Sequence, residues 1–206
     1  MPGFADLRSE LLALLAGKSV KRGNFTLASG ARSDFYIDAK LTTLDPRGAI
    51  LAGQVGWEVV KRTAAERKLR INAIGGLTMG ADPLALSIGI AAQRDEPQNT
   101  LQTFSVRKEA KKHGRHKLIE GNFSPGDLVV VVDDVCTTGG STVQAIEAIE
   151  AARGAIAFAL VLVDREEGGR ANIEQRGYPV VPIFTRSEVL AADAWKQPPL
   201  EAARVA

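Results

Sequence analysis

Two carboxylates, two threonines, two glycines and a serine closely follow four valines in the segment LVVVVDDVCTTGGST, residues 128–142. The hydroxyls and a row of backbone N–H groups lead into VQAIEAIEAA, which has helical periodicity, and the N-terminus of a helix favours a bound anion. Glycines also let the backbone approach a ligand closely. The loop therefore suits a phosphate, and Asp133 and Asp134 can accept hydrogen bonds from the hydroxyls of a sugar. Together these groups predict a site for a phosphorylated pentose.

Other interpretations of the same segment stay open on the residues alone. It lacks the GxxxxGK[ST] pattern of P-loops and the GxGxxG pattern of dinucleotide-binding turns. Paired acids at a strand end also hold Mg²⁺ in phosphoacceptor domains, and one Asp could simply cap the following helix. Cys136 is the single cysteine, which excludes an internal disulfide. Because no histidine is near it in sequence, we expect a small buried side chain and not a nucleophile.

A second candidate for chemistry is RKEAKKHGRHK, residues 107–117, which we call the basic segment. It holds six Lys or Arg and one Glu, so its charge is +5, whereas the rest of the chain has 26 − 6 = 20 basic and 24 − 1 = 23 acidic residues. Both histidines, His113 and His116, also lie there. An exposed basic loop and a nucleic-acid surface are the alternatives, and the second is disfavoured because no aromatic residue interleaves the cations.

Alternating strands and helices would position these groups. Near-continuous apolar runs predict strands buried in a parallel sheet, at 71–76, 103–107, 128–135, 155–164 and 180–184. Helical spacing predicts helices at 5–17 with a stop at Gly17, at 46–67 opened by Pro46, at 82–94 and at 140–154. Residues 25–40 predict a strand–turn–strand unit. This order is typical of an open α/β sheet, in which ligands bind beyond the carboxyl ends of the strands.

Length and composition favour one sizeable core, since the chain has 206 residues of which 45% are hydrophobic. The net charge of +2 is too small to imply a polyanionic partner. No apolar run approaches the roughly 18 residues of a membrane span. Acids interrupt the apolar repeat at the N-terminus, which predicts an amphipathic helix instead of a signal peptide. We expect a cytoplasmic protein that binds neither membrane nor nucleic acid.

The segment VVVVDDVCTTGGST resembles the 5-phosphoribosyl-1-pyrophosphate (PRPP) signature of type I phosphoribosyltransferases. Residues 25–40, FTLASGARSDFYIDAK, and 104–121, FSVRKEAKKHGRHKLIEG, resemble orotate phosphoribosyltransferases, and the order of motifs matches along nearly the whole chain. The resemblance implies a type I phosphoribosyltransferase fold, a mostly parallel central sheet flanked by helices with a small N-terminal hood. It also implies one domain over 1–206, made of a helix and hood over about 1–45, an α/β core over about 46–190 and a tail over 191–206.

The resemblance further implies roles for the PRPP residues. Asp133 and Asp134 are expected to bind the ribose hydroxyls, and the loop from Thr137 to Ser141 is expected to hold the 5-phosphate. In the family a mobile RKxxKxHG loop closes on pyrophosphate, and Lys111 is expected to be the main catalytic cation beside the two acids. The full set of expected PRPP-binding residues is Arg107, Lys108, Lys111, His113, Asp133, Asp134, Val135, Cys136, Thr137, Thr138, Gly139, Gly140 and Ser141.

The acceptor base calls for a cation, because orotate carries a carboxylate. Arg165 stands just past a predicted strand end and matches the family's orotate-binding arginine, and a guanidinium suits bidentate pairing with a carboxylate. The resemblance adds Thr137, Phe35 and Tyr36 to the orotate site. The alternative for Arg165 is an exposed ion pair with Glu166 or Glu167.

The implied activity is transfer of the phosphoribosyl group from PRPP to orotate, giving orotidine 5′-monophosphate and pyrophosphate in pyrimidine biosynthesis. Mg²⁺ is the expected cofactor, held by the substrate with no residue assigned as a metal ligand. A homodimer that shares the basic segment across subunits is the expected assembly. Ala28 and Met79 stand where some family members have lysine. A purine phosphoribosyltransferase and a non-catalytic PRPP-sensing regulator are the alternatives.

Overall fold

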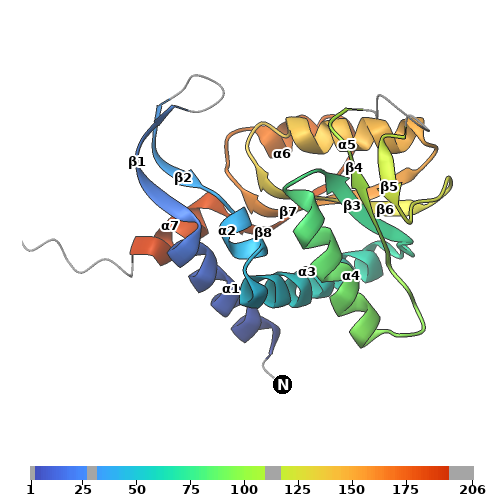
Figure 1. Ribbon diagram of the computed structural model, residues 1–206, viewed down its shortest axis with the longest axis horizontal. Coiled ribbons are helices and arrows are strands. Elements are labelled where there is room, and N and C mark those ends of the chain that lie inside the picture. The colour runs from blue at the N-terminus through green and yellow to red at the C-terminus, as the bar shows by residue number, and fades with distance from the viewer. Residues whose placement is uncertain (1–2, 27–31, 110–116, 195–206) are drawn as a thin grey trace, which may run out of the picture.

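The sheet that carries both candidate segments has six strands in the order β5-β4-β3-β6-β7-β8. Figure 1 shows how the helices lie around it in the computed structural model, which describes residues 3–26, 32–109 and 117–194. All neighbouring strands are parallel except β5, which is antiparallel to β4. The strands are β3 (Ala73–Leu77), β4 (Gln102–Val106), β5 (Ile119–Gly121), β6 (Leu128–Cys136), β7 (Ala155–Asp164) and β8 (Val180–Thr185). The predicted fold class is confirmed, and the short strand β5 was not predicted.

Helices cover both faces of this sheet, with α3 and α4 on one face and α5 and α6 on the other (Figure 1). Side chains of a strand point alternately to its two faces. Accordingly, Val130 and Val132 belong to the apolar cluster under α3 and α4, whereas Val129 and Val131 belong to the cluster under α5. The helices are α1 (Phe4–Lys18), α2 (Lys40–Thr43), α3 (Pro46–Arg67), α4 (Ala81–Asp95), α5 (Gly140–Ala151), α6 (Gly169–Glu174) and α7 (Arg186–Ala194). Within the described part of the chain, no helix is both long and apolar enough to cross a membrane.

Local signals explain where several helices begin and end. Asp45 caps α3 by accepting a hydrogen bond from the Gly48 N–H. Proline at the first helical position has no N–H that would need a partner. The predicted helix 46–67 is confirmed. The predicted stop at Gly17 was wrong, because α1 continues through Lys18. The short helices α2 and α6 and the helix α7 were not predicted, and α7 crosses the expected boundary between core and tail at residue 190.

The N-terminal region ends in a two-stranded hairpin, β1 (Val20–Thr26) and β2 (Arg32–Ile37), which we call the hood. The predicted strand–turn–strand unit is confirmed in its strands, while residues 27–31 between them lie outside the described residues. The hood stands beside α7 (Figure 1), and Arg22 Nε donates to Asp193 Oδ2 at 2.9 Å. This contact joins the hood to the C-terminal helix.

The direction in which the chain adds strands reverses between β3 and β6. After β3 the chain forms β4 on one side, and it then returns to place β6 on the other side of β3. In open α/β sheets such a reversal leaves a crevice at the carboxyl ends of the two strands, where ligands bind. The loop after β3 and the segment after the four valines therefore lie where such a crevice is expected, and we call this region the crevice.

Candidate functional site

The two acids of the valine segment lie within β6 and not beyond it. The predicted strand over 128–135 already contains both acids, and β6 extends one residue further because it pairs with β7 as far as Cys136. Both side chains are buried, with exposed fractions of 7% for Asp133 and 9% for Asp134. Asp133 Oδ2 accepts a hydrogen bond of 2.9 Å from Thr142 Oγ1 on α5. Burial and the neighbouring Asp134 raise the pKa of Asp133 to about 7.

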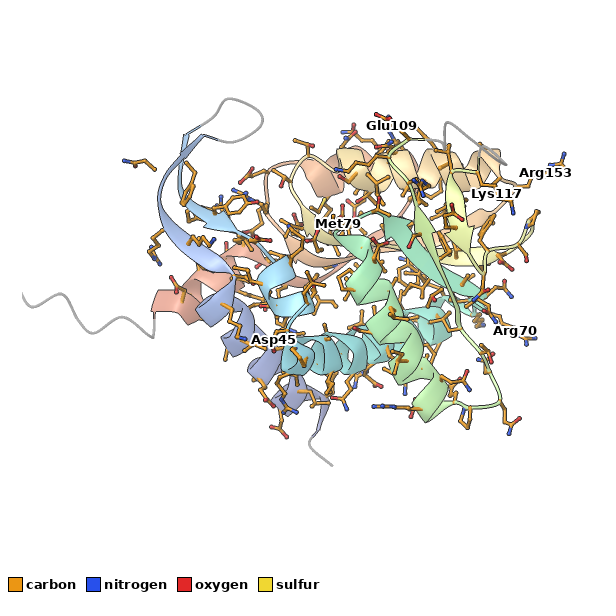
Figure 2. All side chains as sticks on the ribbon, in the orientation of Figure 1. Asp45, Arg70, Met79, Glu109, Lys117 and Arg153 are labelled. Atoms are coloured by element: carbon orange, nitrogen blue, oxygen red, sulfur yellow. The ribbon has the colours of Figure 1, made fainter. Side chains whose placement is uncertain are left out.

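Asp134 faces a different part of the crevice, as expected for consecutive residues of a strand. Its carboxylate lies against Gly80 in the loop between β3 and α4, where a Cβ atom would be 2.7 Å from the carboxyl carbon. Met79 in the same loop has a side chain that is 72% exposed (Figure 2). Asp133 thus contacts α5, whereas Asp134 contacts the loop between β3 and α4.

The loop of residues 137–141, which we call the donor loop, joins β6 to α5. Gly139 precedes α5 with a left-handed backbone, φ 78°, and no side chain caps this helix N-terminus. The alternative in which an Asp caps α5 is therefore wrong. Cys136 is 1% exposed, and burial raises the pKa of its thiol to about 12, in line with the expected small buried side chain.

Helix α6 holds the donor loop in place through its carbonyl groups. The Thr137 carbonyl accepts from the Gly169 N–H at 3.0 Å, and the Thr138 carbonyl accepts from Asn172 Nδ2 at 2.9 Å. A Cβ atom at position 169 would lie 2.6 Å from the Thr137 oxygen and 2.7 Å from Cys136 Sγ. Only glycine fits here, and these supporting residues were not predicted from the sequence.

Arg165 stands between the donor loop and the hood. Its N–H donates to the Cys136 carbonyl at 2.9 Å, and its guanidinium carbon lies 5.2 Å from the centroid of the Phe35 ring. The side chain is 3% exposed, and Nη2 lies 2.7 Å from Glu167 Oε1. The ion pair that was weighed as an alternative is thus present but buried. Among the described residues, Arg165 Nε is buried without a hydrogen-bond acceptor, whereas Nη2 has the ion pair with Glu167 but no hydrogen bond of good geometry.

The two aromatic residues of β2, Phe35 and Tyr36, have different surroundings. Phe35 is 8% exposed and contacts both Arg165 and the guanidinium of Arg186, whose carbon lies 5.7 Å from the ring centroid. Tyr36 is 38% exposed, and its ring lies 5.8 Å from that of Phe25. Because adjacent residues of a strand point to opposite faces, Phe35 and not Tyr36 lies beside Arg165.

The described ends of the basic segment are fixed to the rest of the fold. The Arg107 N–H donates to the Leu118 carbonyl at 2.8 Å, and the Lys108 carbonyl accepts from Gln144 Nε2 of α5 at 2.9 Å. Glu109 and Lys117, which border residues 110–116, lie on the α5 side of the sheet (Figure 2). The predicted residues Lys111 and His113 lie outside the described residues.

Lys40 is a cation of the site that the sequence did not reveal. Its Nζ lies 2.8 Å from Asp38 Oδ1. The hydrogen bond to Asp38 raises the pKa of Lys40, and the charge of Asp134 adds to this effect. The signal available in the sequence was its position at the end of the motif FTLASGARSDFYIDAK. Among the residues that the structure describes, no three His, Cys, Asp or Glu side chains gather as a metal site.

The chain is similar to curated proteins named orotate phosphoribosyltransferase. It is 39% identical to one from Rhodopirellula baltica over 175 residues, which are 85% of this chain and 90% of that protein. It is 40% identical to one from Aquifex aeolicus over 186 residues, which are 89% of this chain and 97% of that protein. Crystal structures of the Mycobacterium tuberculosis orotate phosphoribosyltransferase are similar as well. The Fe(III) dicitrate complex matches with a TM-score of 0.75 and 34% identity, over 89% of this chain and 98% of that one. The complex with PRPP matches with a TM-score of 0.70 and 29% identity, over 92% of this chain and 93% of that chain. No family model matches the chain.

Proposed function

The chain belongs to the orotate phosphoribosyltransferase family, and we propose that the crevice between β3 and β6 is its active site. The enzyme transfers the 5-phosphoribosyl group from PRPP to orotate, forming orotidine 5′-monophosphate and pyrophosphate in pyrimidine biosynthesis. The observation that carries the assignment of the site is the position of the donor loop. This loop lies between the buried acids Asp133 and Asp134 and the buried Arg165. The backbone N–H of Arg165 donates to the carbonyl of Cys136, the last residue of β6.

The donor binds at the end of β6. Asp133 and Asp134 accept hydrogen bonds from the ribose hydroxyls, and the N–H groups and hydroxyls of the donor loop hold the 5-phosphate. Asp133 suits this task because it also has a partner, Thr142, that orients its carboxylate. The proposed donor-binding residues are those expected from the sequence, namely Arg107, Lys108, Lys111, His113, Asp133, Asp134, Val135, Cys136, Thr137, Thr138, Gly139, Gly140 and Ser141.

The acceptor binds between Arg165, Thr137 and the hood. The buried Arg165 Nε, which has no acceptor among the described residues, suits the carboxylate of orotate, since a buried donor left unpaired costs about 1–3 kcal/mol. Phe35 lies against the same guanidinium and forms an apolar wall for the planar base. Tyr36, which also belongs to the proposed orotate site, faces the other side of the hairpin.

The chemical step breaks the bond between C1 of the ribose and a pyrophosphate oxygen, which keeps the electron pair. The N1 atom of orotate forms the new bond to C1 and loses its proton to solvent, so that no general base is required. Charge grows on the pyrophosphate as it leaves. Lys111, with Arg107, Lys108 and His113, stabilises that charge and excludes water.

Magnesium is the cofactor that we propose, carried by the donor. The described residues offer two adjacent acids at the crevice and no third ligand near them, which fits an ion held chiefly by substrate oxygens. When bound, the ion neutralises charge on the pyrophosphate. Asp133 and Asp134 would orient the hydroxyls of that complex.

A homodimer completes the proposal, with the basic segment of one protomer reaching the site of its partner. Large apolar side chains are exposed on the α2–α4 side of the molecule, namely Leu41, Leu44, Ile50, Met79, Leu86 and Ile90. Leu86 and Ile90 are four residues apart on α4 and so lie on one side of it. Burial of such side chains against a second copy would stabilise the pair. We also propose that the chain is one cytoplasmic domain with the hood, core and tail described above.

A spectrophotometric assay separates this function from its alternatives. Loss of orotate absorbance in the presence of PRPP and Mg²⁺ is expected for the wild-type protein, with a fall in turnover of about a hundredfold or more for Lys111→Ala and an unchanged circular dichroism spectrum. Faster consumption of adenine or xanthine than of orotate would favour a purine phosphoribosyltransferase. Absence of turnover with any base, despite PRPP binding, would favour a regulator.

A further inference from the structure

Glu166, the residue after the buried arginine, joins the loop that follows β7 to the N-terminus of α7. Its Oε2 accepts hydrogen bonds from Ser187 N–H at 3.0 Å and from Ser187 Oγ at 2.6 Å. Its own N–H donates to Asp164 Oδ1 at 2.9 Å. The backbone of Glu166 is left-handed, with φ 57°, which is uncommon for a residue with a Cβ atom. Asp164 thus holds the backbone of Glu166, and Ser187 holds its side chain.

These contacts fix the backbone on both sides of Arg165. On the N-terminal side, Asp164 belongs to β7 and its carboxylate accepts from Glu166, so the chain turns sharply around Arg165. On the C-terminal side, the Glu166 side chain binds α7, twenty-one residues later in the sequence. The Arg165 guanidinium lies against Phe35 with only 3% of the residue exposed. A small shift of this backbone would move the guanidinium.

The same helix N-terminus reaches the hood. Arg186, the first residue of α7, has its guanidinium carbon 5.7 Å from the Phe35 ring, and its Nε lies 3.8 Å from Glu166 Oε2. Phe35 therefore contacts one arginine from the β7 loop and one from α7. The Glu166–Ser187 contact holds the elements that carry both arginines together.

We propose that Glu166 is a positioning residue for the acceptor base, acting through Arg165. Its hydrogen bonds to Ser187 hold Arg165 and the Phe35 wall at the separation that orotate requires. The proposal rests on the proposed function, in which Arg165 binds the carboxylate of orotate. It adds a residue that does not itself touch the base.

Steady-state kinetics of the full chain test this proposal. Glu166→Ala removes the acceptor for Ser187, and we expect it to raise KM for orotate about tenfold, less than the roughly hundredfold effect of an ångström-scale misplacement. The KM for PRPP should stay within about twofold, because the donor loop is held by α6 instead. Glu166→Gln keeps an oxygen acceptor, and we expect it to restore KM for orotate to within about threefold of the wild type.

Glu188→Ala is the matched control on the same helix. Glu188 is exposed to a similar degree, 38% against 37% for Glu166, and it likewise accepts from a backbone N–H, that of Thr185, and pairs with an arginine, Arg8. These contacts with Thr185 and Arg8 do not involve Arg165 or the loop after β7. We expect Glu188→Ala to lower the melting temperature without raising KM for orotate.

A double-mutant cycle with Arg165→Met separates the possible failures. If Glu166 acts through Arg165, Glu166→Ala should have no further effect on KM for orotate once Arg165 is replaced. Additive effects, or an unchanged KM in Glu166→Ala, would overturn the positioning role while leaving the site intact. An unchanged KM in Arg165→Met alone would instead overturn the assignment of the orotate site.

Discussion

Gly80, the residue before α4, lies directly against Asp134 of β6, and a Cβ atom at position 80 would be 2.7 Å from the carboxyl carbon of Asp134. The contact joins the loop after β3 to the strand that carries the acids, across the point where the strand order reverses. Asp134 can occupy its position only because residue 80 has no side chain. The crevice is therefore shaped from both of its strands.

Replacement of Gly80 by alanine should displace the Asp134 carboxylate. The backbone of Gly80 has φ −67°, which alanine adopts freely, so the effect should come from the collision alone. We expect kcat/KM for PRPP to fall by about tenfold or more, with little loss of stability. Gly3→Ala is the control, because a Cβ atom there makes only an ordinary contact with Asp6. Equal kinetics in both variants would contradict a role for Asp134 in binding PRPP.

Stability should depend on pH through Asp133. Its pKa is raised to about 7 from 3.8, so between these values the folded protein holds a proton that the unfolded chain has released. The free energy of unfolding should therefore fall as pH rises from about 4 to about 7. Asp133→Asn removes this dependence while its amide oxygen can still accept from Thr142. Urea unfolding at several pH values tests this, and parallel curves for the two proteins would contradict it.

Loss of Lys40 should weaken the binding of PRPP. Lys40 is a cation whose pKa is raised by the hydrogen bond to Asp38 and by the charge of Asp134, so it interacts with an acid of the crevice. We expect Lys40→Met to raise KM for PRPP about tenfold, equivalent to about 1.4 kcal/mol. Lys18→Met is the control, since Lys18 also forms an ion pair, but with Asp45, the residue that caps α3. A similar KM in both variants would show that Lys40 has no part in binding.

Alanine substitutions at the adjacent residues Gly168 and Gly169 should affect the affinity for PRPP differently. A Cβ atom at position 169 would collide with Thr137 and Cys136, so Gly169→Ala should distort the donor loop and weaken PRPP binding by tenfold or more, at about 1.4 kcal/mol per tenfold. At Gly168 nothing lies within 4 Å, but φ is 90°, so alanine should cost only about 1–2 kcal/mol of stability. Calorimetric titration with PRPP distinguishes the two, and equal affinities would contradict the support of the loop by α6.

Elements with strong local signals could be predicted from the sequence. The valine run of β6 and the apolar run of β7 are buried on both faces, and α3 begins at its proline and aspartate as expected. The short helices α2 and α6 span too few residues for periodicity to show. Strand β6 ends at Cys136, one residue beyond the predicted strand 128–135, because Cys136 pairs with Asp164 of β7.

The site was predictable in part. The acids and the donor loop are contiguous, so their chemistry follows from one segment. The place of Arg165 beside Phe35 joins residues 130 positions apart, and only the family resemblance indicated a shared role. Lys40, Gly80 and Gly169 owe their importance to contacts between elements, which no spacing in the chain reveals.

A crystal structure of the protein with PRPP and Mg²⁺ tests the central claim most directly. We expect the 5-phosphate against the N–H groups of residues 137–141, the ribose hydroxyls on Asp133 and Asp134, and the pyrophosphate facing the loop that contains Gly80. A donor bound away from residues 133–141 would contradict the account.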